Sequence, residues 1–205
     1  MKENYQIKME KIIENLSNDR VPSLLLHVCC APCSSYVLEL LSNYFEITLV
    51  YYNPNIYPKA EYDKRYNEID KVLKGTKYKY LISVLEVEYD PESFDEISKG
   101  LEKESEGGTR CHKCYYLRLE KTATLAHNLN FDYFTTTLSI SPYKNASILN
   151  RIGEVLEDKY KVKYLYADFK KKEGYKRSIE LSKKYDLYRQ EYCGCLYSIQ
   201  KEETN

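Results

Sequence analysis

The sequence alternates short apolar runs with longer stretches of helical periodicity, and this alternation limits the folds open to the chain. The first apolar run covers residues 23–28, and runs of strand character follow at 46–52, 80–89, 131–138 and 162–166. Strands that alternate with helices form parallel sheets through right-handed crossovers. We therefore expect an α/β fold, a single α/β/α sandwich around a mainly parallel five-stranded sheet, with helical additions.

Helical spacing of apolar residues predicts the intervening elements. Helices are expected at residues 3–17, 34–44, 59–74, 91–103, 111–128, 141–159, 176–184 and 196–202. Ser34 or Ser35 is a candidate cap for the second helix. No repeat or clear linker interrupts the chain, so we expect one catalytic domain over 1–205. Residues 1–20 would be an N-terminal helical extension, and residues 190–205 a C-terminal segment that carries cysteines.

Composition limits the location and the partners. The chain has 205 residues with 31 basic and 31 acidic side chains. It lacks both an apolar stretch of about 20 residues and an apolar signal-peptide core, which predicts a cytoplasmic protein without a membrane partner. The balance is uneven along the chain, because residues 84–106 are mainly acidic and residues 159–189 mainly basic. That pattern permits one basic face, but it is more typical of two solvated surfaces.

Seven cysteines stand in three groups along the chain: Cys29, Cys30 and Cys33; Cys111 and Cys114; Cys193 and Cys195. Cytoplasmic thiols stay reduced, so the grouping favours metal or redox chemistry over structural disulfides. The groups are at least 78 positions apart, which disfavours a small zinc module but leaves open one zinc held across the fold. An iron–sulfur cluster needs four ligands, which two loops can supply. Two metal centres, or a cluster and a redox-active dithiol, would use all seven.

The last group has a single glycine between its cysteines, Cys193 and Cys195. A disulfide between them would be strained, and strained disulfides are easily reduced, which suits a catalytic pair. Two ligands to one metal ion are the competing interpretation. The sequence leaves both open.

Three of the distinctive segments follow predicted strands, namely residues 29–33, 53–58 and 139–145. Ligands of open parallel sheets bind at the carboxyl ends of the strands, so these segments predict a shared site. A Cys-Cys-Ala-Pro-Cys sequence stands after the first strand in place of a glycine-rich phosphate loop, so no use of ATP is expected. His27, inside the first strand, is expected to be a packed core residue.

Five motifs together resemble the cobalamin-independent epoxyqueuosine reductase family, QueH. They are HVCCAPC (27–33), YNPNI (52–56), CHKC (111–114), TTLSISPYKN (136–145) and YRQEYCGC (188–195). The resemblance implies an adenine-nucleotide α-hydrolase-like fold. It also implies an oxidoreductase that reduces epoxyqueuosine to queuosine at the wobble position of tRNA, the final step of queuosine biosynthesis. A zinc-stabilised RNA-binding protein without catalytic activity is the alternative from another class.

The resemblance also implies the metal centres. A [4Fe-4S] cluster would be held by Cys29, Cys30, Cys111 and Cys114, with Cys33 as an alternate or second-metal ligand. Cys193 and Cys195 would be a redox-active pair or the ligands of an additional mononuclear iron or other metal ion. An external electron donor would reduce the enzyme.

The RNA partner is a tRNA that carries epoxyqueuosine in its anticodon loop. The residues in or near the matched motifs that we expect to bind it are Ser139, Ser141, Lys144, Asn145, Arg177, Arg189 and Gln190. The run Lys170–Lys172 is a candidate positioning patch, although such a run is more often a solvated loop. Candidate proton donors are Tyr143, Tyr192 and Asp168.

Overall fold

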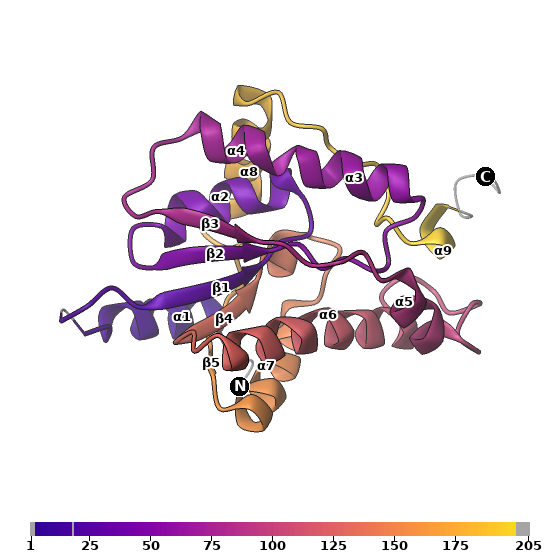
Figure 1. The fold of residues 1–205 in the computed structure, drawn as a ribbon, viewed down its shortest axis with the longest axis horizontal. Helices are drawn as coiled ribbons and strands as arrows, with labels where there is room; N and C mark the ends of the chain where they lie inside the picture. The colour runs from indigo at the N-terminus through magenta and orange to yellow at the C-terminus, as the bar shows by residue number, and fades with distance from the viewer. Residues whose placement is uncertain (1–2, 18, 200–205) are drawn as a thin grey trace.

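The computed structural model describes residues 3–17 and 19–199, which form a central sheet with helices on both faces (Figure 1). The five strands are β1 (Ser23–His27), β2 (Glu46–Val50), β3 (Ile82–Leu85), β4 (Tyr133–Thr136) and β5 (Lys163–Tyr164). Their order is β3-β2-β1-β4-β5, and every pairing is parallel. The predicted α/β fold with a five-stranded sheet is confirmed, and the sheet is entirely parallel.

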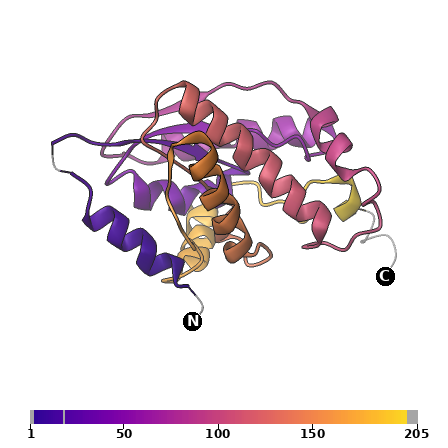
Figure 2. The ribbon, with the colours of Figure 1, turned by 90° about the horizontal axis from the view of Figure 1, so that it is seen from below.

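Helices cover both faces of this sheet, as Figures 1 and 2 show. The elements of the described chain are α1 (Tyr5–Glu14), α2 (Ala31–Leu41), α3 (Lys59–Asn67), α4 (Ile69–Gly75), α5 (Pro91–Ser98), α6 (Thr109–Asn128), the 3-10 helix η1 (Thr137–Ile140), α7 (Ala146–Tyr160), α8 (Gly174–Lys184) and α9 (Leu196–Ile199). Helices α2, α4 and α8 lie on one face, and α6 and α7 lie on the other.

The two faces of the sheet have separate apolar cores. Side chains of successive strand residues point to opposite faces, so Leu24 and Leu26 of β1 enter one core while Leu25 enters the other. Met9 of α1 is buried in the first of these cores. A parallel sheet buried on both faces exposes only its strand ends, and the carboxyl ends carry the segments of interest.

The second helix begins earlier than its sequence indicated. Helix α2 starts at Ala31, directly after Cys30, because Pro32 in the first turn suits a helix start. The prediction that Ser34 or Ser35 caps it was wrong, since both lie buried inside the helix. Their hydroxyls donate to the carbonyls of Ala31 (3.0 Å) and Pro32 (2.9 Å). Cys33 therefore lies in the first turn of α2.

Other boundaries also differ from the predicted ones. The stretch 59–74 divides at Glu68 into α3 and α4. Helix α7 begins after Asn145 and not at residue 141, because the Asn145 side chain accepts a hydrogen bond from the backbone N–H of Ser147 (3.0 Å). The predicted C-terminal helix is described only through Ile199, and its residues 200–202 lie outside the described chain.

Parts of two predicted segments, residues 1, 2 and 18 of the N-terminal extension and residues 200–205 of the C-terminal segment, lie outside the described residues. Within residues 3–17 and 19–199, no helix is both long and apolar enough to cross a membrane.

Candidate active site

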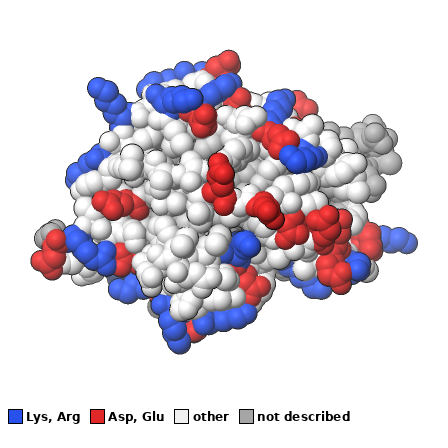
Figure 3. All heavy atoms as spheres, in the orientation of Figure 1, with Lys and Arg blue, Asp and Glu red and all other residues white. Residues whose placement is uncertain are grey.

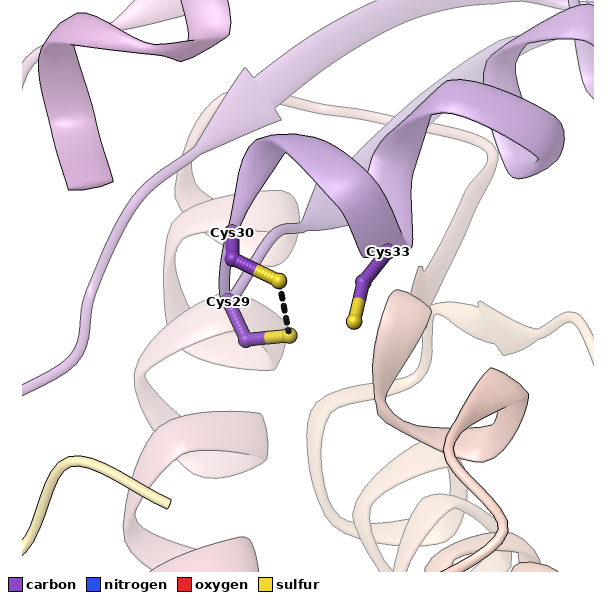
Figure 4. A group of neighbouring side chains, drawn as sticks. All are labelled: Cys29, Cys30 and Cys33. Atoms are coloured by element: carbon purple, nitrogen blue, oxygen red, sulfur yellow. Dashed lines mark hydrogen bonds between the residues drawn. The ribbon is translucent and has the colours of Figure 1, made fainter. Parts of the chain in front are cut away.

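The first three cysteines converge where β1 passes into α2 (Figure 4). Cys29 and Cys30 lie in the short loop after β1, and Cys33 lies one helical turn further on. Their sulfur atoms lie within 4.8 Å of one another, and the Sγ atoms of Cys29 and Cys30 are 3.8 Å apart. Three thiols at this spacing form a group that can hold a soft metal ion.

The pKa values of the three thiols are shifted in opposite directions. Hydrogen bonds from Cys30 and then from Cys33 hold the pKa of Cys29 well below its ordinary value. The same contact with Cys29 raises the pKa of Cys30 to about 12 and that of Cys33 well above its usual range. Cys29 is therefore the most acidic of the three thiols, and a thiolate is the form that binds metals.

Two distant segments complete the surroundings of this group. The hydroxyl of Thr137 in η1 lies 3.6 Å from Cys29 Sγ. The side-chain amide of Gln190 donates to Cys30 Sγ at 3.2 Å. The loop after β1, the turn after β4 and the C-terminal segment thus meet at the carboxyl edge of the sheet, and the C-terminal segment was not among those predicted to lie there.

The pair Cys193 and Cys195 lies in the C-terminal segment beside a buried lysine. Lys144 Nζ lies 3.1 Å from Cys193 Sγ and 3.3 Å from a carboxylate oxygen of Glu106. A hydrogen bond from Cys195 and the ammonium charge of Lys144 hold the pKa of Cys193 well below its ordinary value. The bond to Cys193 raises the pKa of Cys195, so the pair holds one thiolate and one thiol.

Lys144 is itself 8% exposed. Burial lowers its pKa, but the charge of Cys193, its hydrogen bond to Lys144 and the nearby Tyr115 and Glu106 together outweigh burial and raise the pKa above the ordinary value. Lys144 therefore stays an ammonium ion beside the thiolate.

Glycine is required between the two cysteines. Gly194 has φ of +111°, and a Cβ atom there would lie 2.9 Å from Arg65 Nη1. Arg65 donates to the carbonyl oxygen of Cys193 (3.2 Å), and the N–H of Tyr57 donates to that of Gly194 (2.8 Å). These contacts fix the loop against the segment after β2.

Cys111 and Cys114 lie in the first two turns of α6, and both are buried. Cys111 Sγ accepts a hydrogen bond from the backbone N–H of Gly107 (3.3 Å). Burial raises the pKa of Cys114 to about 11, although the charge of Arg118 opposes the shift. Cys114 packs with Cys195. The group of sulfur atoms within 4.8 Å includes neither Cys111 nor Cys114, so the four-cysteine ligand set stays a prediction.

Arg118 is a buried cation at the centre of these thiols, and the sequence reasoning missed it. Burial lowers its pKa, but the charges of Cys114, Cys29 and Cys193 outweigh burial and raise it. Its guanidinium donates to Asn53 Oδ1, and its Nε lies 3.4 Å from the Nε2 of His27. The spacing held a signal, because residues 111, 114 and 118 lie on one face of a helix.

His27 is a buried residue of β1, as expected. Burial and the neighbouring charge of Arg118 lower its pKa to about 3, so the ring is neutral. Its Nδ1 lies 2.8 Å from the hydroxyl of Thr136.

A cavity of about 470 Å³ opens at this edge of the sheet. Its wall includes the thiols Cys29, Cys33 and Cys193, together with the cations Arg65, Arg118, Lys144 and Arg189. The wall also includes two carboxylates, Glu106 and Glu191. Thiols and fixed positive charges therefore face the same space, which suits redox chemistry on an oxygen-rich ligand.

The predicted substrate-binding residues divide into two sets. Ser141, Lys144, Arg189 and Gln190 line the cavity. Ser139, Asn145 and Arg177 are not among its lining residues.

The second set makes contacts within the fold. Ser139 is buried, and its hydroxyl accepts from the N–H of Phe169 (3.4 Å). Asn145 caps α7. Arg177 pairs with Glu39 (2.8 Å) and Glu180 (3.1 Å).

The candidate proton donors are placed differently from one another. Tyr143 lines the cavity and is 79% exposed. Tyr192 also lines it, with its hydroxyl donating to the carbonyl of Tyr57 (3.0 Å). Asp168 is not a lining residue and pairs with Lys170 (2.6 Å).

Part of the basic stretch 159–189 is paired with carboxylates. Lys170, Lys172, Lys176 and Arg177 each form an ion pair. On the face drawn in Figure 3, acidic side chains gather on the side where α5 lies, and Lys and Arg side chains are dispersed. The described positive charges nearest the thiols are those inside the cavity.

Comparison with known proteins shows the family of the chain. The family model for the epoxyqueuosine reductase QueH matches residues 24–201. The chain is 43% identical over 202 residues to an epoxyqueuosine reductase QueH of Streptococcus pyogenes, which covers 97% of this chain and 79% of the relative. The QueH of Staphylococcus epidermidis is 43% identical over 97% of this chain and 86% of its own length. The QueH of Thermotoga maritima is 37% identical, over 86% of this chain and 90% of its own length.

The chain belongs to the epoxyqueuosine reductase QueH family. Membership makes it an oxidoreductase of queuosine biosynthesis, and the family implies a tRNA substrate. The family match begins at Leu24, so α1 lies before it, although the similarity to QueH of S. pyogenes spans nearly the whole chain.

Proposed function

We propose that the chain reduces the epoxide of epoxyqueuosine to the alkene of queuosine at the wobble position of tRNA, as the final step of that biosynthesis. The observation that carries the proposal is the cavity at the carboxyl edge of the sheet, where Cys29, Cys33 and Cys193 face buried cations. Family membership supplies the substrate. Removal of the epoxide oxygen as water consumes two electrons and two protons. Thiols or a metal centre must provide the electrons, and an acidic group must provide the protons.

The donor set suits an iron–sulfur cluster. Our proposed ligands are Cys29, Cys30, Cys111 and Cys114, with Cys33 as the alternate or second-metal ligand. The low pKa of Cys29 and the buried positive charge of Arg118 both favour an anionic sulfur-rich group at this place. When bound, a [4Fe-4S] cluster supplies electrons one at a time from an external donor.

Cys193 and Cys195 are the proposed second centre. As a dithiol, the pair supplies two electrons to the substrate and becomes a disulfide, which the external donor reduces again. As metal ligands, the two sulfurs hold a mononuclear iron or other metal ion. Lys144 serves both roles, because its ammonium group stabilises the Cys193 thiolate at 3.1 Å.

The cavity is of a size that holds a single nucleoside side arm or base. RNA-modifying enzymes take the target base out of the stack, so we propose that the wobble base enters here. Ser141, Arg189 and Gln190 contact the base or its neighbouring phosphates. Ser139, Asn145 and Arg177, which do not line the cavity, would contact the anticodon loop only outside it. The exposed ring of Tyr143 provides a surface for stacking.

The proposal extends to the architecture. The strand order β3-β2-β1-β4-β5 supports an adenine-nucleotide α-hydrolase-like fold. Residues 1–205 act as one cytoplasmic catalytic domain, in which residues 1–20 are an extension and residues 190–205 contribute Cys193 and Cys195. Cysteines replace the phosphate loop after β1, which supports a reaction without ATP.

Anaerobic purification tests the proposal. The protein should be brown, contain about four iron and four sulfide or more, and convert epoxyqueuosine in tRNA to queuosine when a reductant is added. Cys114→Ser should lose visible absorbance and turnover together. A colourless zinc protein without turnover would favour the RNA-binding alternative, and full activity of Cys114→Ser would contradict the ligand set.

A further inference from the structure

The segment after β2 holds two asparagines in opposite situations. Asn53 is satisfied at both ends, because its Nδ2 donates to the carbonyl of Val28 (2.9 Å) and its Oδ1 accepts from Arg118. Asn55 is 3% exposed, and within the described residues 3–17 and 19–199 its buried Oδ1 has no hydrogen-bond partner. Asn55 lines the cavity, whereas Asn53 does not.

A buried amide oxygen without a partner is rare, because it has lost its water and gained nothing in return. The segment has little freedom to correct this. The N–H of Ile56 donates to Asn53 O (3.1 Å), Tyr89 donates to Ile56 O (2.7 Å), and the N–H of Tyr57 donates to Gly194 O (2.8 Å). Asn55 is thus held in place beside the cavity with an unused acceptor, which is the arrangement of a preorganised binding group.

The other polar groups of the wall indicate what Asn55 recognises. The charged donors of the wall are Arg65, Arg118, Lys144 and Arg189. Hydroxyl groups in the wall can also accept hydrogen bonds, but the Oδ1 of Asn55 is the cavity-lining acceptor that is buried and unpaired within residues 3–17 and 19–199. A ligand that fills this space needs a partner for its own N–H or O–H groups. Asn55 supplies that partner in the wall that also contains Cys29 and Cys33, where the proposed reduction takes place.

We propose that Asn55 is a specificity-determining residue whose Oδ1 accepts a hydrogen bond from an N–H or O–H donor on the epoxide-bearing side arm of the modified base. This inference rests on the proposed function. An unmodified guanosine lacks the side arm and leaves the acceptor unpaired. Sites with a buried polar group discriminate strongly against ligands that fail to pair with it.

The test is a binding comparison with the cluster-loaded enzyme and no external electron donor, and the recovered tRNA is analysed for queuosine to verify that no turnover has occurred. The two probes are tRNA with epoxyqueuosine and the same tRNA with guanosine at that position. Asn55→Leu keeps a similar volume and removes the acceptor. It should weaken binding of the modified tRNA by about tenfold and leave binding of the unmodified tRNA unchanged.

Thermal unfolding separates recognition from a structural role. Asn55→Leu breaks no bond of the fold, so its Tm should equal or exceed that of the wild type. Asn53→Leu is the matched control, and its Tm should fall because Arg118 and the Val28 carbonyl lose their partner. With a reductant present, the KM of Asn55→Leu should rise more than its kcat falls.

Several outcomes would overturn the inference. If Asn55→Leu binds both tRNAs more weakly by the same factor, Asn55 contacts a part of the tRNA that the two probes share and not the side arm. A lower Tm of Asn55→Leu with unchanged discrimination would make Asn55 structural. Asn55→Asp keeps an acceptor oxygen and should still discriminate between the two tRNAs. If Asn55→Asp discriminates as poorly as Asn55→Leu, the NH2 group of Asn55 and not its Oδ1 makes the contact, which contradicts the inference. Absence of epoxide reduction by the wild type would instead refute the proposed function, whatever the binding ratios.

Discussion

The two ends of the parallel sheet have opposite character. At the amino end, Asp132 accepts from the N–H (2.9 Å) and hydroxyl (3.0 Å) of Ser23 and also pairs with Arg20. At the carboxyl end, a thiolate faces the buried Lys144, and Asn55 keeps an unused acceptor. The amino end thus ties β1 to the start of β4, while the carboxyl end holds a charged pair and an unpaired acceptor that face the cavity. The groups that stabilise the fold and the groups that react are therefore at opposite ends of the sheet.

Cys193→Ser should produce the largest effect and act on the carboxyl end alone. We expect turnover to fall on the order of 10³-fold or more, since the thiolate is part of the reactive centre. The free energy of unfolding should change little. Single-turnover assays with urea unfolding check this, and visible absorbance should persist because the cluster thiols are intact. Joint loss of absorbance would show that Cys193 belongs to the cluster.

Lys144→Met should reduce turnover by roughly 10- to 100-fold, because a charged hydrogen bond to the thiolate is lost. Lys144 lowers the pKa of Cys193, so its removal raises that pKa. Alkylation of Cys193 in the metal-free protein should therefore be slower at neutral pH, with its pH profile moved to higher pH. Lys144→Arg keeps the charge and is the control. If the pH profile of Cys193 alkylation is the same in Lys144→Met as in the wild type, Lys144 does not stabilise the Cys193 thiolate.

Asp132→Ala should act only at the amino end. It leaves the Ser23 N–H without its acceptor and should cost about 1–3 kcal/mol of unfolding free energy. Turnover should be unchanged, and a loss of activity without a loss of stability would contradict the division between the two ends.

The same carboxylate predicts a pH dependence. Hydrogen bonds from Arg20 and Ser23 depress the folded-state pKa of Asp132. A depressed pKa contributes stability that is present above the unfolded value of about 3.9 and is lost as the pH falls below it. Urea unfolding of the wild type and Asp132→Asn should therefore differ at neutral pH and converge in acid. A constant difference would show that ionisation is not involved.

Arg177→Gln should have the smallest effect. Its ion pairs with Glu39 and Glu180 lie at the surface, where such pairs contribute about 0–1 kcal/mol. We expect its tRNA affinity to fall less than that of Arg189→Gln, because Arg189 lines the cavity. Titrations at two salt concentrations check the order, and a larger loss for Arg177→Gln would move the RNA surface to α8.

The sequence predicted those elements of the fold that leave a local pattern of apolar residues. Apolar runs and helical spacing predicted the five strands and the carboxyl edge as the place of the site, because burial on both faces leaves a direct signature. It failed at helix starts. Ser34 and Ser35 have the chemistry of caps, but Pro32 begins α2 before them, and Asn145 begins α7 after the predicted position.

By itself, the sequence determined the parallel architecture, the three groups of cysteines and the family. Only the tertiary structure decided which groups meet. Lys144 was expected to bind the tRNA, and its side chain is buried against Cys193, which is 49 positions away in the sequence. Arg118 and Asn55 gained importance in the same way, through partners found or lacking across the fold. The physical reason is that a charge or an acceptor acquires its role from the groups within a few ångströms, and local periodicity carries no record of them.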